Sequence, residues 1–131
     1  MKKFPRKSRL VESVVKYFSS NPRFKQIVGH AEAPFETREE LGCLMCDALI
    51  DAFNADIAVE NPGGVRIDSH PAGDITLLDV LEMDPFDNNA VVLELTGEEL
   101  LRMMLTYSNS QVLGFPFVGG MRCELTTEKD N

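Results

Sequence analysis

A chain of 131 residues, 44% hydrophobic and 26% charged, is long enough for one globular domain with a buried core. Its formal net charge of −8 argues against nucleic acid as the main partner, because a phosphate-binding surface needs a basic stripe. No apolar run reaches the roughly 18 residues of a membrane span. The start does not resemble a signal peptide, since Glu12 and Lys16 interrupt the apolar residues that follow the basic end.

Residues 1–25 are interpreted as a tail with an amphipathic helix, and residues 26–131 as the domain itself. Apolar residues recur at helical spacing from Leu10 to Phe18, and Asn21-Pro22 ends the pattern. The basic residues within 2–9 could contact nucleic acid or form a solvated tail. Residues 25–31 are predicted to form a short strand.

Three capping boxes, at Thr37, Thr76 and Thr96, predict the starts of three further helices. The first of these helices carries an apolar stripe over 41–53 that we interpret as core. The second is expected to end near residue 83 and the third at residue 107. Short strands are expected at 56–60, 90–95 and 115–125, and residues 68–73 as a loop. Short strands with uneven connections predict an α+β domain, with a mixed β-sheet packed against about four helices.

Cysteine and histidine give no sign of a reactive centre. Cys43 and Cys46 form a C-x-x-C in the middle of a helical pattern, without a second ligand pair for zinc, which predicts buried, unreactive thiols. His30 and His70 are too scattered for a dinuclear metal site, and we interpret them as surface or loop residues. No Ser-His-Asp or Cys-His set stands out, so we predict no complete catalytic apparatus.

The turn N-P-G-G-V-R, residues 61–66, is the first candidate binding site. Gly63 and Gly64 let the backbone approach a ligand, and Asn61 offers a donor and an acceptor to a base edge. Arg66 offers a fork for phosphate or vicinal hydroxyls. The alternative is a capped turn with an exposed arginine. Phe86, in a polar loop, could stack on a planar ligand or anchor its loop in the core.

Five segments, taken in order, resemble the C-terminal domain of 5′-nucleotidases, a family that includes bacterial UDP-sugar hydrolases and 2′,3′-cyclic phosphodiesterases. They are E-L-G-C-L-M-C-D-A-L, A-D-I-A-V-E-N-P-G-G-V-R, A-G-D-I-T-L-L-D-V, D-P-F-D-N-N and V-V-L-E-L-T-G-E-E-L, within residues 26–123. The resemblance implies the fold of that domain, which supplies the substrate pocket. A separate N-terminal metallophosphatase domain of the family holds two divalent metal ions and performs the hydrolysis.

Carried onto this sequence, the resemblance implies that Asn61 contacts the nucleobase and that the backbone of Gly63 and Gly64 lines the pocket. Arg66 would hold ribose hydroxyls or phosphate. Phe86 would be one half of an aromatic clamp around the base.

The family also places an upstream arginine in the pocket, for which Arg38 is the candidate. The chain departs from the pattern at Cys43, at Pro62, which stiffens the turn, and at Asp87, which adds negative charge beside the clamp. The family's closing G-G-D-G-[FY] segment has no counterpart before Asn131, and the G-N-H-[ED] metal motif of the catalytic domain is absent.

These features predict a truncated substrate-recognition domain of a metal-dependent 5′-nucleotidase-like phosphohydrolase, inactive by itself. We expect a nucleoside or nucleotide ligand with about millimolar affinity, since stacking on one ring contributes about 1–3 kcal/mol. The other expected partner is the metallophosphatase domain of a parent protein; nucleic acid and membrane are not expected. The alternative is a non-catalytic interaction module that keeps the fold and has lost the ligand. The parent family is mostly periplasmic or cell-surface, but no signal peptide is seen here, which leaves the localisation open.

Overall fold

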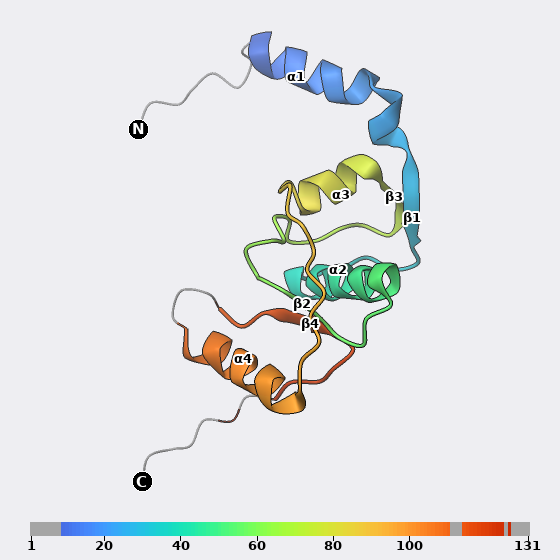
Figure 1. Ribbon diagram of the computed structural model, residues 1–131. Helices are drawn as coiled ribbons and strands as arrows, with labels where there is room; N and C mark the ends of the chain where they lie inside the picture. The colour runs from blue at the N-terminus through green and yellow to red at the C-terminus, as the bar shows by residue number, and fades with distance from the viewer. Residues whose placement is uncertain (1–8, 111–113, 125, 127–131) are drawn as a thin grey trace, which may run out of the picture.

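A computed structural model describes residues 9–110, 114–124 and 126 of the chain (Figure 1). Helices and strands are interspersed along this part. In order they are α1 Arg9–Ser20, the 3-10 helix η1 Pro22–Lys25, β1 Ile27–Ala31, α2 Arg38–Phe53, β2 Ala58–Glu60, β3 Gly73–Thr76, α3 Leu77–Met83, α4 Gly97–Asn109 and β4 Phe117–Gly119. The predicted α+β class with four helices is confirmed. The predicted tail lies mostly in residues 1–8, outside the described residues.

The capping boxes set the helix starts. The Thr37 hydroxyl accepts a hydrogen bond from Glu40 N at 3.2 Å, and the Glu40 carboxylate accepts one from Thr37 N at 3.3 Å. The same reciprocal pair stands at Thr76 and at Thr96. Each pair satisfies amides that the first helical turn leaves without a partner. The three predicted starts are therefore confirmed.

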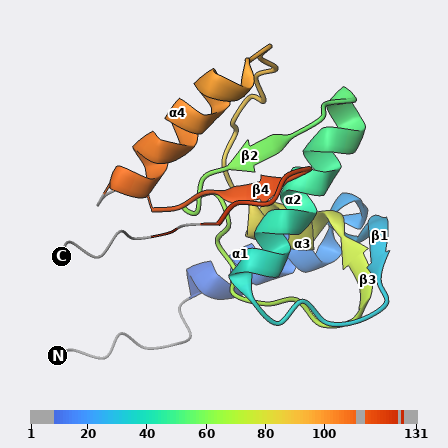
Figure 2. The ribbon, with the colours of Figure 1, turned by 90° about the horizontal axis from the view of Figure 1, so that it is seen from below.

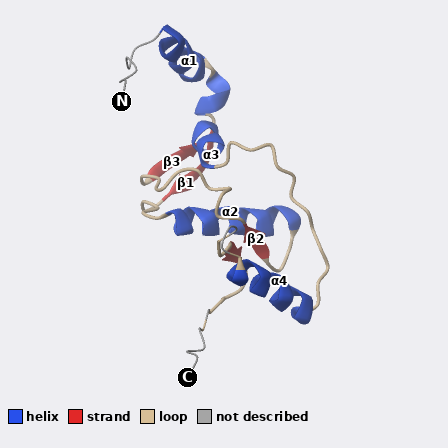
Figure 3. Ribbon diagram, turned by 90° about the vertical axis from the view of Figure 1, so that its left-hand side faces the viewer, coloured by secondary structure: helices blue, strands red, loops and turns tan. Residues whose placement is uncertain are grey.

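The described strands form two antiparallel pairs instead of the single mixed sheet that we predicted. β1 pairs with β3, with Ala31 opposite Gly73, and β2 pairs with β4, with Glu60 opposite Phe117. Helix α2 lies between the two pairs, as Figures 2 and 3 show. β3 begins within the predicted loop of residues 68–73. The sequence indicates which residues favour an extended backbone, but strand partners come from contacts that are distant in the chain.

The core lies where α2 packs against β2 and β4. Its buried cluster consists of Leu41, Cys46, Ala58, Val65, Met83 and Phe117. The predicted core stripe of α2 is only partly buried: Leu41 is inaccessible, whereas Ala48, Ala52 and Phe53 are exposed. The stripe continues past the edge of the small β2–β4 pair, which is too narrow to cover it.

Residues 90–95, predicted as a strand, form no strand in the structure. The segment runs from α3 to α4 with its side chains in solvent, and Val91 is 76% and Leu93 65% exposed. β-branched residues favour a strand only when a neighbouring strand pairs with them. The predicted strand at 115–125 is also shorter, since β4 ends at Gly119; Leu125 lies outside the described residues.

Cys43 differs from its prediction, whereas His70 lies in a loop, as predicted, and is buried there. Cys46 is buried, as predicted, and burial, followed by the nearby Cys43 thiol, raises its pKa to about 11; Cys43, however, is exposed. His70 is only 7% exposed, because its backbone bridges to Phe35 and its Nδ1 lies 2.8 Å from the Pro71 carbonyl oxygen. The position of Cys43 around the α2 helix explains its exposure, and the backbone contacts of the loop explain the burial of His70.

Candidate functional site

The turn of residues 61–66 is anchored to the core. Gly64 N donates to the Asn61 carbonyl at 3.0 Å, which closes the turn. The next residue, Val65, is completely buried, and Arg66 N donates to the Met83 carbonyl at 2.8 Å. The backbone on both sides of the buried valine is thus held, while the Arg66 side chain extends into solvent.

The two glycines of the turn make room for neighbouring polar groups. A Cβ at Gly64 would lie 3.2 Å from the Asn61 carbonyl oxygen and in collision with the Glu60 carboxylate. A Cβ at Gly63 would lie 3.0 Å from the Asn61 side-chain oxygen. Glycine therefore permits the close approach of Glu60 and Asn61 to the turn.

Arg66 and Phe86 lie together on the surface. The guanidinium carbon is 5.7 Å from the centroid of the Phe86 ring, within the range of a cation–π contact. Phe86 is 47% exposed, and its backbone N–H donates to the Asp84 carboxylate at 3.1 Å. This exposure favours the stacking interpretation of Phe86 over the core-anchor interpretation.

Asn61 and Glu60 form a second pair beside the turn. The Asn61 amide donates to the Glu60 carboxylate at 3.0 Å. Burial raises the pKa of Glu60, and the negative charge of Asp84 raises it further, while a hydrogen bond from the Asn61 backbone opposes both. Glu60 was not among the predicted site residues. Its position between a strand and a glycine-rich turn was the signal that could have identified it.

Arg38 has a different partner from the one the sequence suggested. Its guanidinium, at the start of α2, donates through Nε to the Asp68 carboxylate at 3.1 Å and also through a terminal nitrogen. The structure therefore brings Arg66 to Phe86 and Asn61 to Glu60, and gives Arg38 an ion pair with Asp68.

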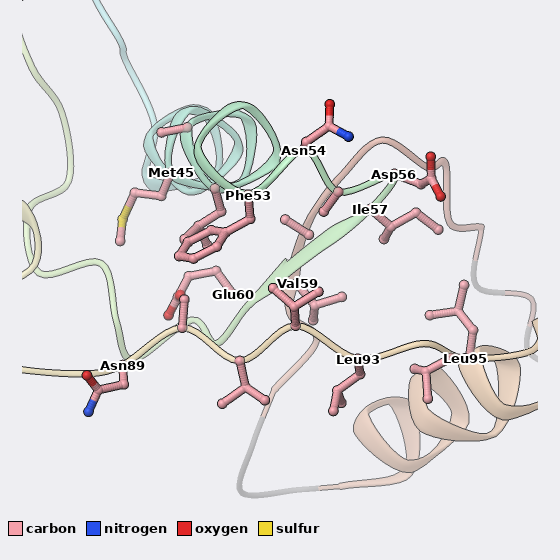
Figure 4. A pocket seen from close by; sticks show the side chains of 18 of the residues that line it. Met45, Phe53, Asn54, Asp56, Ile57, Val59, Glu60, Asn89, Leu93 and Leu95 are labelled. Carbon is pink, nitrogen blue, oxygen red and sulfur yellow. The ribbon is translucent and has the colours of Figure 1, made fainter.

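An open groove of about 1310 Å³ lies between α2, β2 and residues 88–100 (Figure 4). Met45 and Phe53 project from α2 toward the segment that carries Leu93. The groove is lined mainly by apolar side chains, together with four carboxylates and no basic residue. The carboxylates belong to Asp56, Glu60, Asp84 and Glu94. Asn61, Arg66 and Phe86 do not line this groove, so the turn and the groove are neighbouring surfaces that share Glu60.

The described part of the chain contains neither a cluster of metal ligands nor a helix suited to a membrane. No group of three or more His, Cys, Asp or Glu side chains there is arranged to hold a metal ion. Asp68 and His70, which are two positions apart, do not form a metal site together, because Asp68 binds Arg38 and His70 faces the Pro71 carbonyl. Within the same residues, no helix has the length and apolar character required to cross a bilayer.

Comparison with known proteins gives a consistent match. The family model described as "5'-nucleotidase, C-terminal domain" matches residues 22–131. A 5′-nucleotidase of Vibrio parahaemolyticus is 48% identical over 61 residues, which cover 47% of this chain and 11% of that protein. The Protein UshA of Yersinia enterocolitica is 40% identical over 72 residues, which cover 55% of this chain and 13% of that protein.

A solved structure shares the fold. The crystal structure of a 5′-nucleotidase precursor from Thermus thermophilus superimposes with a TM-score of 0.64 and 29% sequence identity, covering 82% of this chain and 24% of the other.

The trifunctional nucleotide phosphoesterase protein of Bacillus subtilis is 36% identical over 95 residues, 66% of this chain and 6% of its own length. The matched region is thus a small part of each of these proteins.

Proposed function

Since the chain belongs to the family of 5′-nucleotidase C-terminal domains, we propose that it recognises a nucleoside or nucleotide for a metal-dependent phosphohydrolase. The contact between Arg66 and the exposed Phe86 ring carries this proposal. An aromatic face binds a base by stacking, and a neighbouring guanidinium binds hydroxyls or phosphate. The hydrogen bond from Arg66 N to the Met83 carbonyl holds the end of the turn beside the loop that carries Phe86.

The charges beside the turn favour a ligand of low negative charge. Besides burial, the nearby charge of Asp84 raises the pKa of Glu60, so these two carboxylates lie close together. Asp87 follows Phe86 directly. A phosphate near Arg66 would experience these carboxylates as well as the guanidinium. We therefore expect adenosine to bind at least as well as AMP, and both with about millimolar affinity, since one ring contributes about 1–3 kcal/mol.

In this proposal the hydrolysis itself belongs to a metallophosphatase domain outside these 131 residues, which would hold the two divalent metal ions. The Vibrio 5′-nucleotidase and the Yersinia Protein UshA are both many times the length of the matched region. Within this chain the candidate residues offer binding groups, without a nucleophile or a paired acid and base directed at one point.

A second candidate function is an interaction module without a ligand. The favouring observation is that the candidate polar side chains already have partners in the chain: Asn61 binds Glu60, Arg38 binds Asp68, and Arg66 lies on Phe86. A ligand would have to compete with these contacts.

An NMR titration of the ¹⁵N-labelled chain with adenosine, AMP and UDP-glucose separates the two functions. We expect saturable shifts at Gly64, Arg66 and Phe86, lost in Arg66→Ala and in Phe86→Leu. The matched control is Arg23→Ala, an exposed arginine on η1, which should bind as the wild type does. Shifts that are absent at about 10 mM ligand, or unchanged by Arg66→Ala, would contradict the proposal and support the interaction module.

A further inference from the structure

The charge of this chain is divided unevenly between its two parts. Residues 1–25 hold eight of the 13 basic residues and one acidic residue, a net charge of +7. Residues 26–131 hold five basic and 20 acidic residues, a net charge of −15. The basic part contains the amphipathic helix α1, and the acidic part contains the groove beside β2.

The groove is lined mainly by apolar side chains, and its lining has a net negative charge. Val91, Val92 and Leu93 are each more than 60% exposed, and four carboxylates but no basic side chain join the lining. Apolar surface of this extent, next to an extended segment that pairs with no described strand, is typical of a site that another element covers.

Helix α1 is an element of matching size in the basic part of the chain, and it carries two basic residues and one acidic residue itself. Val14 is 46% and Tyr17 61% exposed, while Phe18 meets Phe24 of η1 with ring centroids 5.0 Å apart. A helix of 12 residues is about 18 Å long. The six residues of segment 90–95, if extended, span about 20 Å. The groove could therefore accept the helix along its whole length.

Within one molecule the two surfaces are far apart. α1 is joined to β1 by η1 and lies beyond α3, whereas the groove lies on the β2 side of α2, next to α4 (Figures 1 and 3). A helix on such a connection reaches the groove of a neighbouring molecule without rearrangement of its own domain.

We propose that α1 of one copy docks in the acidic apolar groove of a second copy, so that two chains exchange their helices in a symmetric dimer. Reciprocal exchange is a common route to a closed dimer, because the same contact forms twice. The net positive charge of residues 1–25 then meets the net negative charge of the groove lining, and the exposed apolar side chains of both surfaces leave water. This inference does not depend on the proposed nucleotide site.

Sedimentation velocity on the full chain tests the proposal. The chain mass is 14.6 kDa, and we expect a species of twice that mass at about 0.1 mM. Val14→Glu on α1 and Leu93→Glu in the groove should each give a monomer, because each places a charge in the apolar contact. The matched control Leu105→Glu, on α4 outside the groove lining, should remain dimeric.

Mixing the two defective chains provides the decisive measurement. Val14→Glu keeps an intact groove and Leu93→Glu keeps an intact helix, so an equimolar mixture should recover a dimer with one good contact. Glu94→Lys should weaken the dimer, whereas Glu82→Lys, an exposed residue outside the groove lining, should not. A monomeric wild type, including one whose α1 folds onto its own groove, overturns the proposal. A dimer that neither Val14→Glu nor Leu93→Glu dissociates also overturns it.

Discussion

Replacing Gly42 with alanine tests how closely α2 packs against β4. Gly42 is buried within α2, and a Cβ there would lie 2.6 Å from Cδ1 of Phe117 and still nearer to two other ring carbons. Phe117 stands opposite Glu60 in the β2–β4 pair. The added methyl group therefore pushes on β4 and, through this pairing, on the strand that leads into the turn of residues 61–66.

Two opposing effects determine the size of the loss. Gly→Ala in a helix interior stabilises by about 1 kcal/mol, while overpacking a core costs about 1–3 kcal/mol. The upper end applies here, because the methyl group would collide with three ring carbons and Phe117 is itself buried. We expect the free energy of unfolding to fall by about 2 kcal/mol, and the melting temperature by about 8 °C for a chain of this size.

Thermal unfolding followed by circular dichroism measures this change. The matched control is Gly97→Ala at the start of α4, where an added Cβ has no neighbour within 4 Å, and its melting temperature should not fall. In the Gly42→Ala background, Phe117→Leu should cost less than it does alone, because the two sites are in contact. A Gly42→Ala variant that melts at or above the wild-type temperature would refute the packing argument.

Two further predictions concern side chains with shifted pKa values. Burial alone would raise the pKa of Asp79, but hydrogen bonds from Thr76 outweigh burial, and the pKa is lowered. The stability that these hydrogen bonds contribute is therefore present above about pH 4, and it is lost as the pH falls through the lowered pKa. Asp79→Asn should therefore lower the free energy of unfolding by about 1 kcal/mol at pH 7, with a smaller difference from the wild type near pH 3; equal differences at both pH values would contradict this. When the chain is treated with iodoacetamide at pH 7.5, peptide mass spectrometry should show that Cys43 is alkylated well before Cys46, because the pKa of the buried Cys46 thiol is about 11. Equal alkylation rates would show that Cys46 is accessible.

The turn of residues 61–66 could be identified from the sequence, because glycines beside an amide and a guanidinium form a local pattern. No local pattern predicts the contact of Arg66 with Phe86, which only the family resemblance placed in one pocket. The two residues are 20 positions apart, and the Met83 carbonyl fixes Arg66 at the end of α3. Glu60 has a local signal, its position between a strand and the glycine-rich turn, but burial and the charge of Asp84, which raise the pKa of its carboxyl group, are products of folding.

What the sequence alone determined is the local part of the structure and the family. The three capping boxes join residues three positions apart, so the helix starts at Thr37, Thr76 and Thr96 depend on local contacts alone. The order of five motifs identified the family, and comparison over residues 22–131 confirms it.

Only the tertiary structure decided which extended segments pair and which apolar faces are covered. Segment 90–95 has the composition of a strand, yet no described strand pairs with it. The apolar stripe of α2 is buried at Leu41 but exposed at Phe53, because the narrow β2–β4 pair covers only part of the helix. Strand pairing and burial depend on neighbours distant in the chain, and a pattern of nearby residues does not specify them.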